Sequence, residues 1–334
     1  MKKPIAIIST VLFAVILGIV VCKEFYYGNY HGEQIRVNIP EGASDVPLLL
    51  RQALGDSFGG KVARLWKLQS GDASVSHGSY LIKDGDNSLR VARKIAKGQQ
   101  TPVRFTFNNT RTLNELAAKV SAVLEVDSAT FINVADTFLT ARGFTREEEA
   151  AAFIPDTYEF YWTVSPQRLV GKLYETREDF WTQDRKDKAR NLGLTQTEVH
   201  TLASIVDGET NKDDEKGMIA RLYLNRLKKE MPLQADPTVK FAMKKFDLRR
   251  ITSENLKYSS PFNTYINKGL PPGPIAIVER NTLNQVLEAP AHDYLYMCAK
   301  SDFSGYHDFA TTYERHRINA ARYHRALDKR GIKN

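Results

Sequence analysis

Hydrophobic positions along the chain follow two periods, and this pattern predicts a mixed α+β protein. Alternation of apolar and polar residues predicts strands at 34–39, 78–82 and 103–107. Elsewhere apolar residues recur every three or four positions, which is typical of amphipathic helices. The helices outside the central stretch described below are expected at 46–54, 63–68, 89–96, 113–124, 130–140, 169–188, 281–287 and 313–328. A buried strand at 294–298 and a turn into another strand at 305–309 are also expected.

The chain begins with an apolar run over residues 5–22, which two lysines precede. This run is long enough to span a bilayer as a helix, and the lysines favour a start in the cytoplasm. The small residues of a cleaved signal peptide are missing, and Val21 stands where a lipoprotein site would have a small residue before Cys22. The sequence therefore predicts a single uncleaved transmembrane anchor over residues 1–24, with the rest of the chain outside the cytoplasmic membrane.

Composition narrows the possible partners. The 334 residues are enough for two or three domains. The net charge of +8 is spread along the chain and favours an anionic surface, such as phospholipid or a cell-wall polymer. No nucleic-acid-binding motif occurs, so nucleic acid is not an expected partner. Because Cys22 lies in the apolar run, a disulfide with Cys298 is not expected, and no Cys/His cluster indicates a metal site. We expect no cofactor.

The stretch from Thr195 to Asp236 is the most informative part of the sequence. Thr195 and Glu198 fit a capping box, which predicts that a helix begins there and continues to its last turn near Gly208. A second helix is predicted to start at Asn211, with three acidic residues in its positive first turn.

Glu209 falls at the end of the first of these helices, at the edge of its apolar stripe, whereas Asp207 is predicted to face outward. Partial burial and the negative end of the helix dipole both disfavour a charged carboxyl, so the pKa of Glu209 should be raised. A carboxyl that keeps its proton near neutral pH is suited to general-acid catalysis. A lone glutamate at a helix end more often caps or ion-pairs in the turn, so other motifs have to support a catalytic role.

Two segments around this stretch have unusual composition. Residues 153–162 are rich in aromatic side chains, which fits either a sugar-binding groove or packing between domains. Residues 261–275 are rich in Gly and Pro, which predicts a stiff irregular loop of the kind that often positions site residues.

Five ordered motifs resemble those of the YceG-like endolytic murein transglycosylases, the MltG family. They are LASIVDGET (202–210), LYLNRL (222–227), LQADPTV (233–239), FNTYINKGLPPGPI (262–275) and YLYMCAKSDFSGYHDFATTYERH (294–316). The resemblance covers the C-terminal third closely and the N-terminal part more loosely. It implies a membrane anchor, a small LysM-like α+β domain that binds peptidoglycan, a helical linking region and a mixed α/β catalytic domain, at 1–24, 25–110, 111–194 and 195–334.

The resemblance also implies an activity. Members cleave the β-1,4 bond after N-acetylmuramic acid within uncross-linked glycan strands, close to the peptidoglycan synthases, and so end strand elongation. The product carries a 1,6-anhydro ring, and one glutamate serves as acid and then as base; this position falls on Glu209. The first acid of the family motif is commonly Glu but is Asp207 here. The positions expected to contact the sugar are Asn225, Gln234, Asp236, Asn263, Thr264, Tyr265 and His307. The implied partners are glycan strands, the cytoplasmic membrane and the synthases.

Two other functions remain open, and a third is disfavoured. Glycosidases that use water need two carboxylates, so a hydrolase would pair Glu209 with Asp207 or Asp236. Asp236 fits equally a capping role beside Pro237. A non-catalytic, membrane-anchored scaffold would bind the wall through the small domain and recruit synthases. A pyridoxal-phosphate lyase is disfavoured, because no lysine stands in a recognisable cofactor setting.

Overall fold

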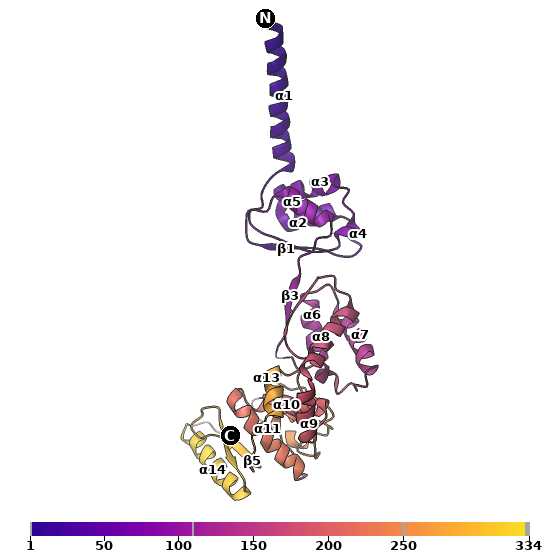
Figure 1. Cartoon of the computed structure of the whole chain (residues 1–334). Coiled ribbons are helices and arrows are strands. Elements are labelled where there is room, and N and C mark those ends of the chain that lie inside the picture. Colours follow the sequence, from indigo (N-terminus) through magenta and orange to yellow (C-terminus); the bar gives the residue numbers. More distant parts are fainter. Residues whose placement is uncertain (1, 109, 249–250, 331–334) are drawn as a thin grey trace. The chain divides into compact units, whose positions relative to one another are not determined.

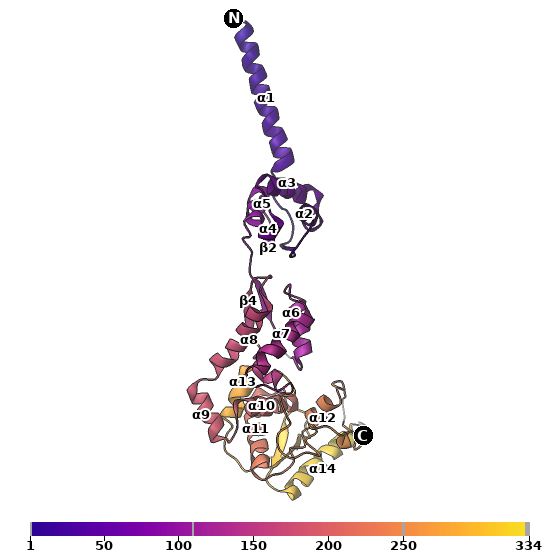
Figure 2. The same ribbon diagram turned by 90° about the vertical axis from the view of Figure 1, so that its right-hand side faces the viewer.

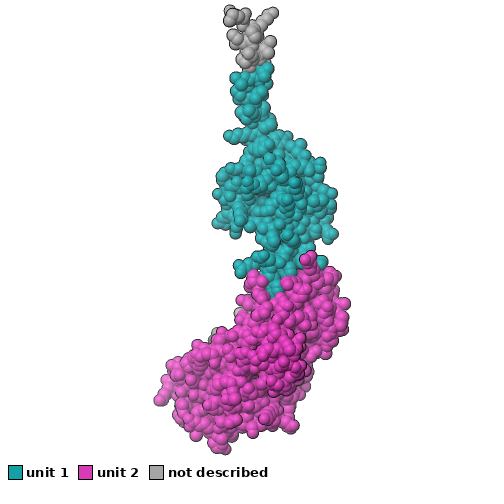
Figure 3. All heavy atoms as spheres, viewed as in Figure 1, with its two compact units in different colours: residues 1–105, 121–126, 158–165 teal, residues 106–120, 127–157, 166–334 magenta. Residues whose placement is uncertain are grey.

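The structure, a computed structural model, describes residues 2–108, 110–248 and 251–330, with side chains from residue 11 onward (Figures 1 and 2). The chain divides into two compact units (Figure 3). Unit 1 contains residues 1–105, 121–126 and 158–165; unit 2 contains residues 106–120, 127–157 and 166–334. Helices with small two-stranded sheets make up both units, which confirms the mixed α+β class.

Unit 1 opens with a long helix followed by a small α+β lobe. Its elements in chain order are α1 (Lys2–Tyr26), β1 (Ile35–Ile39), α2 (Val46–Leu54), the π-helical turn Gly55–Gly59, α3 (Gly60–Leu68), α4 (Ala73–Ser76), β2 (Gly78–Ile82) and α5 (Ser88–Ala96). Among the residues that the structure describes, no helix combines the length and the hydropathy needed to cross a bilayer.

The lobe of unit 1 folds around the antiparallel pair β1–β2. The register places Val37 opposite Tyr80, and burial alternates along the second half of β1, where Val37 and Ile39 are buried on either side of an exposed residue. The helices α2, α3 and α5 cover these apolar side chains and complete one core. The strands predicted at 34–39 and 78–82 and the helices predicted at 46–54, 63–68 and 89–96 are therefore confirmed to within a few residues.

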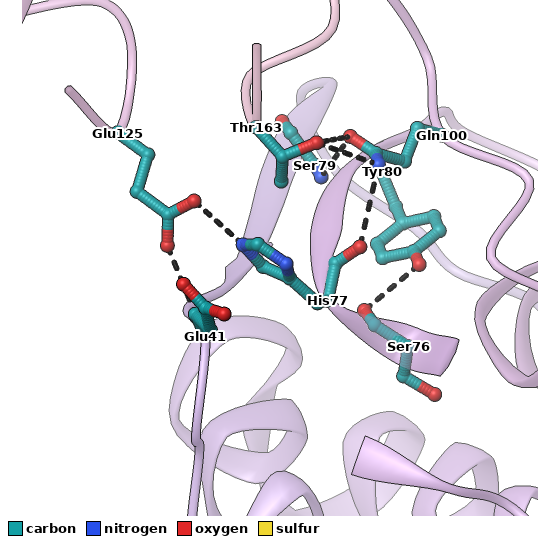
Figure 4. A network of polar contacts seen from close by, with 8 residues as sticks. All are labelled: Glu41, Ser76, His77, Ser79, Tyr80, Gln100, Glu125 and Thr163. Carbon is teal, nitrogen blue, oxygen red and sulfur yellow. Dashed lines mark hydrogen bonds and ion pairs between the residues drawn. The ribbon is translucent and has the colours of Figure 1, made fainter. Parts of the chain in front are cut away.

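Two later segments return to unit 1 and are held there by a polar network (Figure 4). Glu125 lies with one carboxylate oxygen 2.6 Å from His77 Nε2, and its other oxygen accepts from the backbone N–H of Glu41 at 3.0 Å. Gln100 Nε2 donates to the backbone oxygen of His77 and to Thr163 Oγ1. Because both returning segments supply a side chain to this network, they belong with the lobe although they are distant in sequence.

Four residues of the aromatic segment 153–162 are buried, whereas Tyr161 is exposed. Phe153 and Ile154 are inaccessible to solvent, and Tyr158 and Phe160 are nearly so and stack on each other. Residues Thr157–Phe160 form β4, which pairs with β3 (Val103–Thr106). For these four buried side chains, packing rather than a sugar-binding groove accounts for the apolar composition.

Unit 2 is mainly helical. Its elements are α6 (Leu113–Ser121), α7 (Ser128–Thr140), α8 (Pro166–Phe180), α9 (Gln183–Asn191), α10 (Gln196–Glu209), α11 (Asp213–Lys228), α12 (Asp236–Ala242), α13 (Arg280–Leu287), β5 (Tyr296–Ala299), β6 (His307–Ala310) and α14 (Tyr313–Lys329), with 3-10 turns at Glu149–Ala152 and Asn255–Lys257. The segment 261–275 contains no helix or strand, as its Gly and Pro content predicts.

The core of unit 2 is built on α10. Residues 199–206 of this helix are all buried, and α11, α12 and α13 pack around it (Figures 1 and 2). A helix that is buried on all sides in its middle is surrounded by other elements, although His200, Thr201 and Ser204 make this stretch partly polar. Its C-terminal turn is consequently fixed on several sides, and Glu209 belongs to that turn.

Several predicted boundaries in unit 2 are wrong. The helix predicted over 169–188 is two helices, because Trp181 is buried between them and the Thr182 side chain caps α9. The second helix of the central stretch starts at Asp213 rather than Asn211, since Thr210 Oγ1 accepts from the backbone N–H of Lys212 and forms a turn there. The strand β5 is only half-buried, because its sheet has just two strands.

Candidate active site

The helix that carries Glu209 begins and ends where the sequence predicts. Thr195 Oγ1 accepts from the backbone N–H of Glu198 at 3.2 Å, and the Glu198 carboxylate accepts from the N–H of Thr195 at 2.8 Å. This is a complete capping box. The helix ends at Glu209, and Thr210 continues as extended backbone.

Glu209 is partly buried, and its carboxyl group faces Tyr223 of α11. The Tyr223 hydroxyl donates to Glu209 Oε1 at 2.7 Å. Burial raises the pKa of Glu209 to about 7, and the negative charge of Asp236 adds to this effect. The hydrogen bond from Tyr223 and the positive charges of Lys240 and Arg226 act in the opposite direction. The predicted rise in the pKa of Glu209 is thus confirmed, with burial as its largest cause.

Asp207 lies on a different side of α10 and is bound to other residues. Lys216 Nζ lies 2.9 Å from its Oδ1, and Thr282 Oγ1 donates to the same oxygen at 3.0 Å. The side chain of Asp207 is 38% exposed, whereas that of Lys216 is 10% exposed. The prediction that Asp207 faces outward agrees with this exposure, but its carboxylate also pairs with the nearly buried ammonium of Lys216, which Asp213 contacts as well.

The structure brings two of the predicted site residues, Asp236 and Tyr265, into electrostatic range of Glu209. The Tyr265 hydroxyl donates to Asp236 Oδ1 at 2.6 Å. Burial raises the pKa of Tyr265, and the hydrogen bond to Asp236 and the charges of Asp236 and Glu209 add to this effect. Gln234 is exposed, and its Oε1 lies 3.5 Å from a nitrogen of Arg226, whose positive charge acts on Glu209. Asp236 does not cap α12: the N-cap position is Ala235, and no side chain makes a capping bond there. The capping alternative for Asp236 is therefore wrong.

Three other residues that were predicted to contact the sugar form hydrogen bonds with backbone groups. Asn263 is fully buried; its Nδ2 donates to the carbonyls of Leu256 and Tyr258. Thr264 is also buried, and its Oγ1 accepts from the backbone N–H of Ala235. Asn225 Nδ2 donates to two carbonyl oxygens of the segment that leads into β5. The contacts of Asn263 and Thr264 shape the loop and turn that carry Tyr265 and Asp236, and those of Asn225 hold the segment before β5. The expected sugar contact is therefore not the role that their geometry favours.

His307 contacts the start of α11 rather than Glu209. Its backbone N–H donates to Glu215 Oε1 at 2.7 Å, and its Nδ1 lies 2.8 Å from Glu215 Oε2. Glu215 is buried, and Thr210 Oγ1 lies 3.4 Å from its Oε2. Glu215 thus connects His307 to Thr210, the residue after Glu209. Within the described part of the chain, no three His, Cys, Asp or Glu side chains converge as a metal site requires.

Comparison with known proteins decides the family. The model of the YceG-like family matches residues 37–322. The chain belongs to the YceG-like family. It is 26% identical to the endolytic murein transglycosylase of Bacillus subtilis (strain 168) over 287 residues, which cover 80% of this chain and 79% of that protein. It is 31% identical over 114 residues to the endolytic murein transglycosylase of Streptococcus pneumoniae (strain D39), which is 33% of this chain and 21% of that protein.

A solved structure shows the same fold. The crystal structure of a YceG-like protein from Listeria monocytogenes superposes with a TM-score of 0.58 at 25% identity, over 86% of this chain and 98% of that chain. All five motifs quoted above lie inside the matched residues 37–322.

Three residues of this YceG-like site were missed by sequence reasoning as neighbours of Glu209. Tyr223 and Arg226 lie one turn apart on α11 and both act on the Glu209 carboxyl. Their signal was present in the motif LYLNRL, because a buried tyrosine or arginine on a helix needs a polar partner. Lys240 lies on α12, and that helix was not predicted. Arg226 also donates to the carbonyl of Leu295.

The close approach of α12 to α10 depends on Gly208. A Cβ at this position would lie 2.7 Å from Pro237 Cβ, closer than side-chain atoms approach. The absent side chain therefore lets the start of α12, with Asp236, lie against the last turn of α10. In this YceG-like chain the two motifs LASIVDGET and LQADPTV meet at this contact.

Proposed function

We propose that this chain is an endolytic murein lytic transglycosylase with Glu209 as its acid and base. Relatives in Bacillus subtilis and Streptococcus pneumoniae carry this name. The observation that supports the role of Glu209 is its partly buried carboxyl group, whose pKa is raised to about 7 and whose orientation Tyr223 fixes. Such a group is protonated in a useful fraction near neutral pH and is still a competent base after it has lost its proton.

The reaction requires Glu209 to give one proton to the leaving oxygen and then to take one proton from the substrate. Protonated Glu209 donates to the bridging oxygen while the bond from that oxygen to C1 of N-acetylmuramic acid breaks. The resulting carboxylate then removes the proton of the C6 hydroxyl as that oxygen attacks C1. The 1,6-anhydro ring closes, Glu209 is protonated again, and no water is consumed.

The neighbours of Glu209 have distinct roles in this proposal. Tyr223 orients the carboxyl group, and the Tyr265–Asp236 pair and Gln234 present polar groups to sugar hydroxyl and acetamido groups. Asn225, Asn263 and Thr264 fix the backbone beneath them. His307 supports the start of α11 through Glu215.

Product analysis tests the proposal. We expect uncross-linked glycan strands, cut in isotopically labelled water, to yield internal fragments with 1,6-anhydro ends that contain no label. Mass spectrometry distinguishes them, because a hydrolysis product is heavier by one water and contains labelled oxygen. Labelled reducing ends would instead support the hydrolase alternative, with Asp236 as the second carboxylate; that candidate rests on the electrostatic effect of Asp236 on Glu209.

We also propose that residues 1–24 anchor the protein in the cytoplasmic membrane, with the catalytic part outside. The apolar run 5–22 after two lysines supports this placement. An anchored enzyme with a LysM-like lobe is suited to act on strands as synthases release them, and so to terminate elongation.

Deletion of residues 1–24 tests the anchor. We expect the full chain to sediment with membranes and to resist extraction by high salt, whereas the shortened chain is released into the soluble fraction. Fractionation followed by immunoblotting measures this difference. Equal distribution of both chains would contradict the anchor and leave the catalytic proposal unaffected.

A further inference from the structure

A cavity of about 400 Å³ lies in unit 2 beside the candidate acid. One face of α10, including Asp207 and Gly208, forms part of its wall, and Lys240 and Phe241 of α12 form another part. Arg111 and Phe246 also line the cavity. Glu209 is not among the lining residues, so the cavity adjoins the acid across Gly208. Its volume falls within the range of small-ligand pockets.

The cavity contains an excess of positive charge. The Arg111 guanidinium lies 4.6 Å above the Phe246 ring, and its side chain is exposed. Within the residues that the structure describes, neither Arg111 nor Lys240 forms an ion pair. Asp207 is the one acidic side chain among the described lining residues, and Lys216 and Thr282 already bind it. Two cations are therefore left for an anionic ligand.

The cavity is linked to the reaction through Lys240. This lysine lines the cavity and is also close enough to Glu209 to lower the pKa of its carboxyl group. A ligand group that contacts Lys240 would therefore lie within electrostatic range of Glu209, which a group attached to a substrate at Glu209 could reach. Phe241 and Phe246 add an apolar wall, which favours an anion attached to an organic chain over a bare inorganic ion.

We propose that this cavity is a subsite for a carboxylate of the peptide stem that murein strands carry, and that Arg111 and Lys240 bind it. The inference rests on the proposed function for its substrate class. A stem is attached to the lactyl group of N-acetylmuramic acid, next to the bond that is cut, and an uncross-linked stem ends in a free carboxylate. Charge-assisted hydrogen bonds from two cations would make the enzyme select strands with free stem carboxylates.

Binding by a non-cleaving protein tests the subsite. Full-length Glu209→Gln protein is titrated with two synthetic strands of equal length that lack a lipid: one has free stem carboxylates, and the other has the same stems with these groups amidated. We expect about tenfold tighter binding of the free-carboxylate strand, the size of one charged hydrogen bond. Adding Arg111→Gln or Lys240→Gln should bring this ratio close to one.

Matched variants separate the subsite from general charge effects. Arg111 contacts Glu115 only through its backbone N–H, so Arg111→Gln leaves that bond in place. Lys228→Gln removes one positive charge from an exposed site at the end of α11 and should keep the tenfold ratio. Equal binding of the two strands, or an unchanged ratio in both cavity variants, overturns the subsite.

Two further outcomes are distinguishable. A preference that appears only with lipid-linked strands would assign the cavity to their pyrophosphate and overturn the stem proposal. Cleavage is measured separately with the natural chain on the same strands. If that chain cuts neither strand, the proposed function fails, whereas the binding ratio still decides the subsite.

Discussion

Replacing Glu209 with Gln abolishes strand cleavage, with an expected fall in kcat/KM of about 10²–10⁴-fold. The amide keeps the size of the side chain, and the Tyr223 hydroxyl still has an oxygen to bond at the 2.7 Å position. It has no proton of suitable acidity to give to the leaving oxygen and cannot later act as a base. Release of anhydro fragments from uncross-linked glycan, followed by mass spectrometry, measures the loss.

The same variant should be more stable than the natural protein at alkaline pH. The pKa of Glu209 is about 7 in the fold, against an ordinary value of 4.5. Because the folded pKa is the higher one, the natural protein loses stability as pH rises from about 4.5 through 7. The amide that replaces the carboxyl group does not ionise, so Glu209→Gln should gain up to about 3 kcal/mol in unfolding free energy at pH 8 relative to the natural chain, and nearly nothing at pH 4.

This combination excludes a trivial explanation for lost activity. If the variant were inactive because it unfolds, it would be less stable than the natural protein at pH 8, not more stable. Thermal melts at pH 4 and pH 8 therefore accompany the cleavage assay. Asp207→Asn is a suitable control on the same helix turn; it weakens the ion pair with Lys216 and should retain most of the cleavage activity. Cleavage by Glu209→Gln at the natural rate would assign the acid to another residue.

The sequence predicted the helix that carries Glu209 better than the elements that pack against this residue. The capping box at Thr195 and the buried stripe of α10 depend on residues within one or two turns, so pattern alone placed the helix end and the raised pKa. The short helix α12 was missed, because seven residues that begin with Asp236 and Pro237 have too few apolar positions to show a period.

The sequence could not show which of the predicted substrate-contacting residues face a ligand and which bond the backbone, and the reason is physical. Motif membership does not distinguish a side chain that faces a ligand from one that bonds the backbone beneath it. Asn263 and Tyr265 are two residues apart, yet the first is buried on carbonyl groups and the second reaches Asp236. Only the path of the irregular loop decides this, and that path is set by non-local contacts.

Arg226 forms the main polar connection beneath the site. It is 8% exposed, and its Nε donates to the carbonyl of Leu295 at 2.6 Å. One terminal nitrogen donates to the carbonyls of Pro232 and Leu233, at 3.2 and 2.8 Å. This one side chain therefore joins α11, the turn before Asp236 and the segment that leads into β5.

Arg226→Met is expected to destabilise the full-length protein by about 4 kcal/mol, because several buried carbonyl groups lose their donor at once. Cleavage should fall even at temperatures where the protein remains folded, since the turn that holds Gln234 and Asp236 is no longer fixed. Denaturant unfolding and kcat/KM at low temperature measure the two effects. Arg221→Met, on the same helix, removes two similar bonds from a partly exposed guanidinium and should cost about 1 kcal/mol with little change in cleavage. Equal costs for the two variants would show that the carbonyl groups beneath the site find other donors, and Arg226 would then not be what fixes the turn.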